Sequence, residues 1–187
     1  HLLGLNAELQ PTTLYKDENN LWQSPNTLLK ENIKNFLKEK RVIGDWIDIV
    51  DALVVNFQVE FTILADKKNK QQVLIDCLTR LREYFSVYNW QINQPIFISN
   101  VQTLLQEIDG VINVVDLKFY NIFDKDLVTG RQYSPREIGR YKYLSVTSLN
   151  TQNNKFEMMP IDNVIVSAPN TFLSIKYPEA GIIGNAL

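Results

Sequence analysis

The strongest constraint in this sequence is a change of hydrophobic period between residues 53–63 and 69–88. Apolar and polar side chains alternate through the first stretch, which is typical of a strand with one face on a core and one polar face. In the second stretch the period becomes 3.6, and an apolar stripe from Val73 to Tyr88 predicts a helix. A chain that passes from a long strand to an amphipathic helix favours a sheet with helices packed on it.

A second strand and helix follow downstream. Pro95–Ile98 reads as a short extended piece, and Ser99 with Gln102 forms the pattern of a capping box that opens a helix. Gly110 is placed to end that helix in a left-handed conformation. Alternation then predicts a second long strand over about 111–123.

Another helix is predicted upstream, at about 25–40. Ser24-Pro25 is a favourable start, because serine caps a helix N-terminus and proline loses nothing at the first helical position. Apolar residues at helical spacing follow, and the end is basic, with a local charge of about +3 over residues 30–41. We interpret this basic segment as a solvated helix face, with anion binding as the alternative.

We therefore expect an α+β fold: a small mixed sheet with two or three helices packed on one face, in a strand-helix-strand-helix-strand core, plus a β-hairpin excursion. The hairpin and the C-terminal strands rest on four strand-like runs, at Tyr143–Leu149, Phe156–Met159, Val164–Ser167 and Phe172–Tyr177. The expected organisation is a connecting arm at 1–23, a core domain at 24–123, a polar hairpin excursion at 124–162, and C-terminal strands that rejoin the core at 163–187.

Composition removes several classes of function. The 187 residues carry 19 basic and 21 acidic side chains, and a net charge of −2 argues against a dedicated nucleic-acid binder. One cysteine and one histidine, His1, cannot assemble a zinc site or an ordinary nucleophile–histidine pair. No apolar run is long enough to span a membrane. We expect no enzyme activity, no cofactor, and neither nucleic acid nor membrane among the partners; the non-methionine start suggests a fragment of a longer protein.

Two alternatives remain open. Asp45, Asp48 and Asp51 are spaced three residues apart, which on a helix would make them neighbours and could suit a divalent cation. A small ligand- or cation-binding domain centred on them is the alternative function. A nucleic-acid module using the basic segment Lys38–Arg41 is a further hypothesis.

An ordered set of motifs carries a resemblance to a known family. The run Asn26–Leu37, the segments Arg41–Ile43 and Ile49–Ala52, the strand Val54–Val59 and the piece Trp90–Ile96 resemble a stretch of the baseplate wedge subunit of T4-like contractile-tailed phages. Ser99–Leu105, Ile108–Val111, Phe172–Pro178 and Ile182 with Gly184 extend the similarity. More broadly, the pattern looks like the baseplate-J-like proteins of contractile tails. Residues 124–162 match no motif of the family.

The resemblance implies a structural protein of the virion tail baseplate, assembled in the host cytoplasm. Such subunits contact copies of themselves, as dimers or higher oligomers, and other baseplate wedge proteins, to build a ring around the tail hub. Aromatic side chains commonly anchor such interfaces. The candidate interface residues are Trp22, Trp46, Trp90, Tyr133, Tyr141 and Tyr143, with a core position as the alternative for Trp46 and Trp90.

Overall fold

The chain divides into two compact units, His1–Val54 and Val55–Leu187. The structure is a computed structural model, and it describes most of the sequence. The described residues are 4–5, 11–12, 15–16, 22–23, 27–40, 46–66, 69–126, 129–133, 146–150, 155–166 and 168–187.

Short strand pairs occupy the region predicted as a connecting arm. β1 (Gly4–Leu5) pairs with β2 (Pro11–Thr12), and β3 (Tyr15–Lys16) pairs with β4 (Trp22–Gln23), both antiparallel. Strands of two residues are too short to build a hydrophobic face of their own. These pairs therefore add local order to the arm without making it part of the central sheet.

The helix predicted at 25–40 is α1 (Thr27–Lys38), and it belongs to the first unit. The expected core domain at 24–123 includes this helix, so the observed unit boundary differs from the expected one. Ile33 and Leu37 are half-buried, whereas Leu29 and Phe36 stay exposed. An apolar period predicts that a helix has a packing face, but not which part of the chain covers it. Ser24-Pro25 lies outside the described residues.

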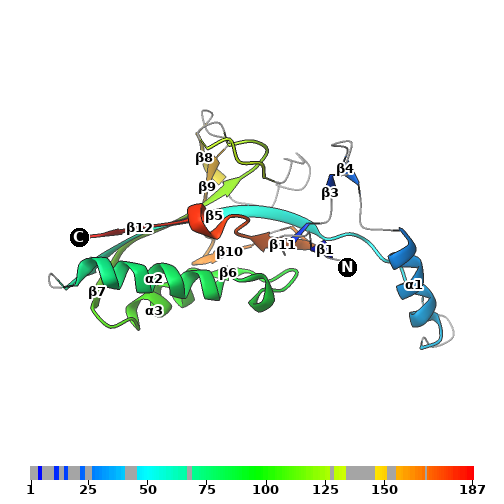
Figure 1. Cartoon of the computed structure of the whole chain (residues 1–187), viewed down its shortest axis with the longest axis horizontal. Coiled ribbons are helices and arrows are strands. Elements are labelled where there is room, and N and C mark those ends of the chain that lie inside the picture. The colour runs from blue at the N-terminus through cyan, green and yellow to red at the C-terminus, as the bar shows by residue number, and fades with distance from the viewer. Residues whose placement is uncertain are drawn as a thin grey trace. The chain divides into compact units, whose positions relative to one another are not determined.

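The second unit is built on one mixed, six-stranded sheet (Figure 1). Its two long strands, β5 (Leu53–Ala65) and β7 (Val111–Ile122), form an antiparallel pair. β9 (Lys155–Met158) pairs with β7, and β8 (Val146–Asn150) pairs with β9, again antiparallel. The hairpin predicted within 124–162 thus exists, but it extends the central sheet and is no separate excursion.

The C-terminal strands lie on the other side of β5. β11 (Thr171–Ser174) joins β5, which confirms that the run beginning at Phe172 returns to the sheet. After the single helical turn α4 (Pro178–Gly181), β12 (Ile182–Ala186) pairs with β5 in parallel. The sequence pattern does not predict β12. Its five residues include a glycine and an asparagine, which are both depleted in strands.

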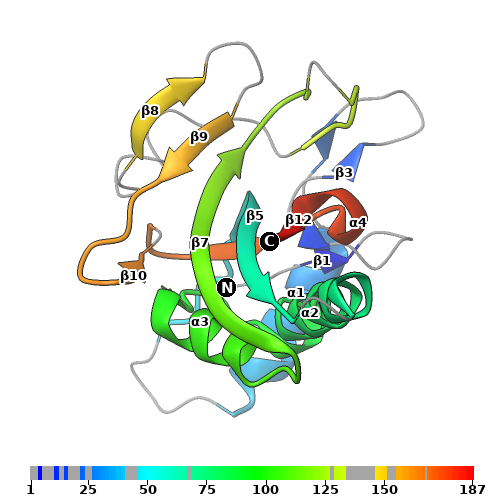
Figure 2. The ribbon, with the colours of Figure 1, turned by 90° about the vertical axis from the view of Figure 1, so that its left-hand side faces the viewer.

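Two helices cover one face of this sheet (Figure 2). α2 (Lys70–Tyr84) packs on β12, and α3 (Ile98–Gln106) packs on β7 and on α2. The class is α+β, as predicted. The predicted helix at 69–88 ends earlier, at Tyr84, and the short 3₁₀ helix η1 (Val87–Asn89) follows it. We call the covered side of the sheet the helix face and the opposite side the outer face.

The segment before α3 corrects two predictions. β6 (Ile96–Phe97) pairs with β10 (Val164–Ile165) in a separate two-stranded sheet, so neither strand joins the central sheet. α3 begins at Ile98, which places Ser99 inside the helix, and no side chain caps its start. The capping box is therefore wrong. The Ile98 N–H donates instead to the Asn163 carbonyl at 2.9 Å, so a tertiary contact sets the start of this helix.

The core lies between the helix face and the two helices. Alternate residues of β5, from Val55 to Ile63, are almost fully buried there, together with Cys77 and Leu81 of α2 and Leu105 of α3. An aromatic cluster closes one end of this core, with edge or tilted contacts between rings 4.9 to 6.5 Å apart. Its members are Phe57, Tyr84, Phe85, Trp90 and Phe119.

Candidate functional site

Three of the predicted interface residues have described side chains, and only one is on the surface. Trp46 is 85% exposed, with the Lys34 ammonium 5.9 Å from its ring centroid. Trp90 is 6% exposed and packs against Phe85, so it takes the core position that was its alternative. Tyr133 is 4% exposed and makes an edge contact with Tyr177, which removes it from the surface of the chain.

The other three residues carry no structural test. Tyr141 and Tyr143 lie outside the described residues, as does the side chain of Trp22, although its backbone is part of β4. Their role as interface anchors stays a prediction.

The aspartate triplet is only partly described. Asp48 is exposed, Asp45 lies outside the described residues, and Asp51 is half-buried with one carboxylate oxygen 2.8 Å from Lys30 Nζ. The other Asp51 oxygen is buried without a hydrogen-bond partner. In the part of the chain that the structure describes, no group of three or more His, Cys, Asp or Glu side chains is placed to hold a metal ion.

Cys77 is a core residue of α2. It is buried in the apolar stripe that the sequence predicted, and burial raises the pKa of its thiol to about 11. The reactive form of cysteine is the thiolate, so this side chain is inert at neutral pH.

The outer face carries a polar cluster at its centre. Lys155 of β9 forms an ion pair with Glu60 of β5, and its ammonium lies 3.9 Å from the ring centroid of Tyr120. Gln58 also donates to the Glu60 carboxylate, at 3.3 Å. Both charged side chains therefore have a partner, and the cluster ties β5, β7 and β9 together across the sheet.

The same cluster changes the acidity of Tyr120. Burial, and then the negative charges of Glu60, Glu157 and Asp116, raise the pKa of the Tyr120 hydroxyl to about 12. A phenol that holds its proton this firmly is a poor base or nucleophile at neutral pH. The geometry fits a structural link between strands better than a catalytic centre.

Part of the polar face is covered, which the sequence did not predict. Asn56 and Gln58 are buried although they point to the outer side of β5. Gln58 borders a cavity of about 190 Å³, whose walls include Arg131, Tyr133 and Ala180 of α4. Asp126, Thr129, Arg131 and Tyr133 therefore lie beside this part of the sheet.

The outer face becomes apolar toward the end of the sheet where β12 ends. Two bulges shift the β5–β7 register, between Thr62 and Ile63 and between Leu64 and Ala65. Each inserts an extra residue into β7, so burial along its first half recurs at every third residue, while the residues between are exposed. Two of the exposed residues are large and apolar: Ile112 at 65% and Val115 at 54%.

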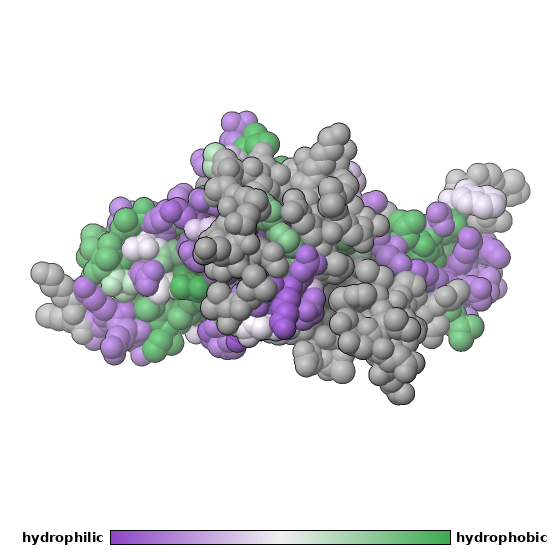
Figure 3. Space-filling view, turned by 90° about the horizontal axis from the view of Figure 1, so that it is seen from above, coloured by the Kyte–Doolittle hydropathy of each residue, from purple (hydrophilic) through white to green (hydrophobic). Residues whose placement is uncertain are grey.

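Three adjacent strands contribute to this apolar area. Leu64 of β5 lies beside Asn113 of β7, and the backbone of Leu187 pairs with β5 just past the end of β12. Green side chains gather at this end of the sheet in the space-filling view (left in Figure 3). We name this area the outer-face patch, and its members are Leu64, Ile112, Val115, Ile183 and Leu187, all exposed. Exposed apolar side chains that neighbour one another in this way mark interaction sites.

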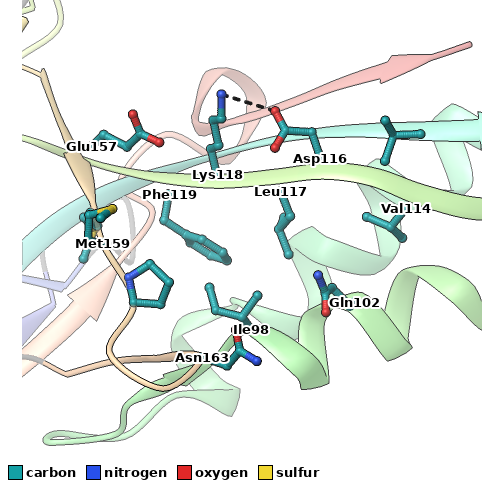
Figure 4. Close-up of a pocket in the computed structure, with 13 residues that line it drawn as sticks. Ile98, Gln102, Val114, Asp116, Leu117, Lys118, Phe119, Glu157, Met159 and Asn163 are labelled. Atoms are coloured by element: carbon teal, nitrogen blue, oxygen red, sulfur yellow. Dashed lines mark ion pairs between the residues drawn. The ribbon is translucent and has the colours of Figure 1, made fainter. Parts of the chain in front are cut away.

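A groove runs along the edge of β7 beside the patch (Figure 4). Its volume is about 290 Å³, and it lies between residues 114–119 of β7, the start of α3, and the chain that leaves β9. Leu117 and Phe119 point toward Ile98 of α3, whereas Asp116 and Lys118 lie on the opposite side of the strand. We name this feature the β7 groove.

Comparison with known proteins adds no assignment. No family model matches the chain, and no curated protein matches it significantly. Among the described residues, no helix is both long and apolar enough to cross a membrane.

Sequence reasoning missed the patch and the groove for a physical reason. Ile112 and Val115 belong to a strand that was predicted, but alternation placed Val115 on the buried side with Leu117. A bulge moves one residue across the sheet, and its position depends on pairing with a strand about fifty residues away. The only local signal was the apolar run Val111-Ile112 followed by Val114-Val115, which alternation does not explain.

Proposed function

We propose that this chain is a structural subunit of a contractile-tail baseplate, which builds contacts with copies of itself and with other wedge proteins. The proposal begins from the ordered motif set in residues 26–120 and 163–187, which resembles the wedge subunit of T4-like phages. A structural role needs surfaces that gain free energy when another chain covers them.

The outer-face patch is the observation that carries the proposal. Burying a large aliphatic side chain is worth about 1.5–3 kcal/mol, so several exposed neighbours leave a substantial driving force for association. The helix face of the same sheet is covered by α2 and α3, whereas in the described chain nothing covers the patch. The side chains of the patch are uncharged, so two copies could bring them together without repulsion between charged side chains.

The test is self-association of the full chain, measured by sedimentation velocity over a range of concentrations. Wild type should shift from monomer to dimer or higher oligomer as concentration rises. Ile112→Lys places a charge in the patch and should weaken association at least about tenfold. Ile112 is well exposed, so the substitution should leave the fold unchanged.

Ile75→Lys is the matched control. Ile75 is 54% exposed on α2, in the helical layer and outside the patch. This variant should associate like wild type. A chain that stays monomeric at high concentration, or equal effects of the two lysines, would count against the proposal.

The baseplate assignment has its own test. Contractile-tail particles purified from the cells that produce this protein should contain its peptides by mass spectrometry. Absence of the chain from intact particles, with the chain present in the lysate, would leave it an assembly protein of another kind.

Cation binding at Asp45, Asp48 and Asp51 is the second candidate, favoured by the buried Asp51 oxygen that has no hydrogen-bond partner. Calorimetric titration with Mg²⁺ or Ca²⁺ distinguishes it. Tight binding that Asp48→Asn abolishes would support this function, whereas heats equal to buffer dilution would remove it.

A further inference from the structure

The edge of β7 is paired along only part of its length. β9 pairs with residues Phe119–Ile122, and no strand in the described part of the chain pairs with the same edge at residues Val111–Lys118. The backbone N–H and C=O groups on that side of β7 therefore have no strand partner there. The β7 groove lies in this position.

Local chemistry explains why β9 stops. Pro160 follows its end and has no N–H to donate to a ladder. Asp162 and Asn163 then adopt left-handed conformations, with φ of 51° and 63°, and turn the chain into β10. Because β9 ends here, the position next to β7 that a longer β9 would have occupied is left open.

The two sides of this path differ in character. On the side toward the helices, Leu117, Phe119 and Ile98 give the groove an apolar wall (Figure 4). On the outer side the charged lining residues are Asp116, Lys118 and Glu157, together with Val115 of the outer-face patch. Successive side chains of an added strand would point alternately to these two sides. A segment that alternates apolar and polar residues therefore matches the groove.

The charged residues at the groove determine which sign of charge the polar residues of an incoming strand should carry. Among the charged residues that line the groove, Asp116 and Glu157 outweigh Lys118. This acidic border favours lysine or arginine on the incoming strand. It also disfavours pairing of two β7 edges, since a second copy would bring the same acidic groups.

The bulges limit how long the added strand can be. They strengthen the twist of β7 near Ile112 and Val115, and such irregular edges resist extended pairing. Regular pairing is therefore expected only next to the end of β9, around Asp116–Lys118. A short added segment is long enough to cover this part of the edge.

We propose that the β7 groove binds a short extended segment of a partner protein, with alternating apolar and basic side chains, as an added strand beside β9. This deepens the proposed function by naming one contact of the assembly, and it rests on that function only in taking the segment from a partner protein. Main-chain hydrogen bonds would supply affinity, and the apolar wall and acidic border would supply selectivity.

The test uses the full chain and a fluorescent synthetic peptide that alternates valine and lysine, followed by fluorescence anisotropy. Glu157→Lys reverses a charge at the groove and should weaken binding at least about tenfold. Glu83→Lys, on an exposed position of α2, is the matched control and should bind like wild type. A peptide that alternates valine and glutamate should bind at least about tenfold more weakly than the lysine peptide.

Two further measurements separate strand addition from simple attraction of a cation. The lysine peptide with N-methyl groups at alternate residues keeps its charge but loses the N–H donors of one edge, so its affinity should fall at least about tenfold. The lysine peptide should also slow amide hydrogen exchange at residues 115–118. Equal affinity of the methylated peptide, or slowed exchange at another edge only, would overturn the proposal.

The outcomes also separate this proposal from the proposed function. If Ile112→Lys abolishes self-association but the lysine peptide does not bind, strand addition alone fails. If the peptide binds but the chain never associates, the self-contacts of the proposed function fail. Concentration-dependent exchange protection at residues 115–118 without peptide would show a second copy in the groove and overturn the proposal.

Discussion

On the helix face of the central sheet, Phe57, Val59 and Phe61 meet the buried side chains of α2 and α3, and every second residue of β5 from Leu53 to Ala65 is buried there. On the outer face of the same strands, a polar cluster occupies the centre, while Leu64 and Val115 remain exposed. The difference shows how a layer of helices packed on a sheet constrains the strands beneath it. Where helices fix the partner surface, the strand residues that face them keep a period of two. The apolar part of the outer face, which no described segment covers, tolerates bulges and exposed apolar residues.

The largest test of this comparison is truncation on the helix face. Phe61→Ala should cost about 3–5 kcal/mol of unfolding free energy, because it opens a cavity in a fully buried site. Ile112→Ala, on the outer-face patch, should change stability by less than about 0.5 kcal/mol at concentrations where the chain is monomeric. Urea unfolding followed by circular dichroism measures both. Similar costs for the two would contradict the division between the faces.

The next test adds a methyl group on the helix face, where close packing leaves no room for it. A Cβ at Gly184 would overlap the Phe61 ring and lie 2.7 Å from Leu74 Cδ1, so Gly184→Ala should destabilise by about 1–3 kcal/mol. Asn185→Ala is the control, because Asn185 is the next residue of β12 and is exposed. A Gly184→Ala variant as stable as wild type would mean that β12 packs less closely than the structure has it.

The polar cluster of the outer face is tested by pH. Because the pKa of Tyr120 is raised to about 12 in the folded chain, the unfolded chain loses this proton first, from about pH 10 upward. The contribution of Tyr120 to stability is therefore fully present below pH 10 and is lost as the pH rises toward 12. Ultraviolet titration of wild type minus Tyr120→Phe should show one phenol ionising near 12. A difference titration near 10 would contradict the burial and charges around Tyr120.

The smallest effect belongs to an ion pair on the outer face. Asp116 and Lys118 are 3.4 Å apart with about half of each side chain exposed. A double-mutant cycle with both residues changed to alanine should give a coupling of about 0.2–1 kcal/mol that decreases with salt. A coupling of several kcal/mol would mean that this part of the outer face is shielded from water.

Much of the fold was predictable because its signals are local. The strands at Leu53–Ala65 and Val111–Ile122, the helix at Lys70–Tyr84 and the left-handed Gly110 all follow from hydrophobic period and turn chemistry. The candidate site was much less predictable. Of the six predicted aromatic anchors, Trp90 and Tyr133 are buried and Trp46 is exposed, because a tryptophan or tyrosine suits a core and an interface equally well.

The sequence by itself determined that strands alternate with helices and that Val55, Phe57, Val59 and Phe61 form one buried face, since these properties depend on neighbours within a few residues. Only the tertiary structure decided that β6 leaves the central sheet, that β12 joins it in parallel, and that Ile112 and Val115 come to the surface. Those outcomes depend on pairing between residues far apart in the chain. A shift of one residue in such a pairing exchanges a buried side chain for an exposed one.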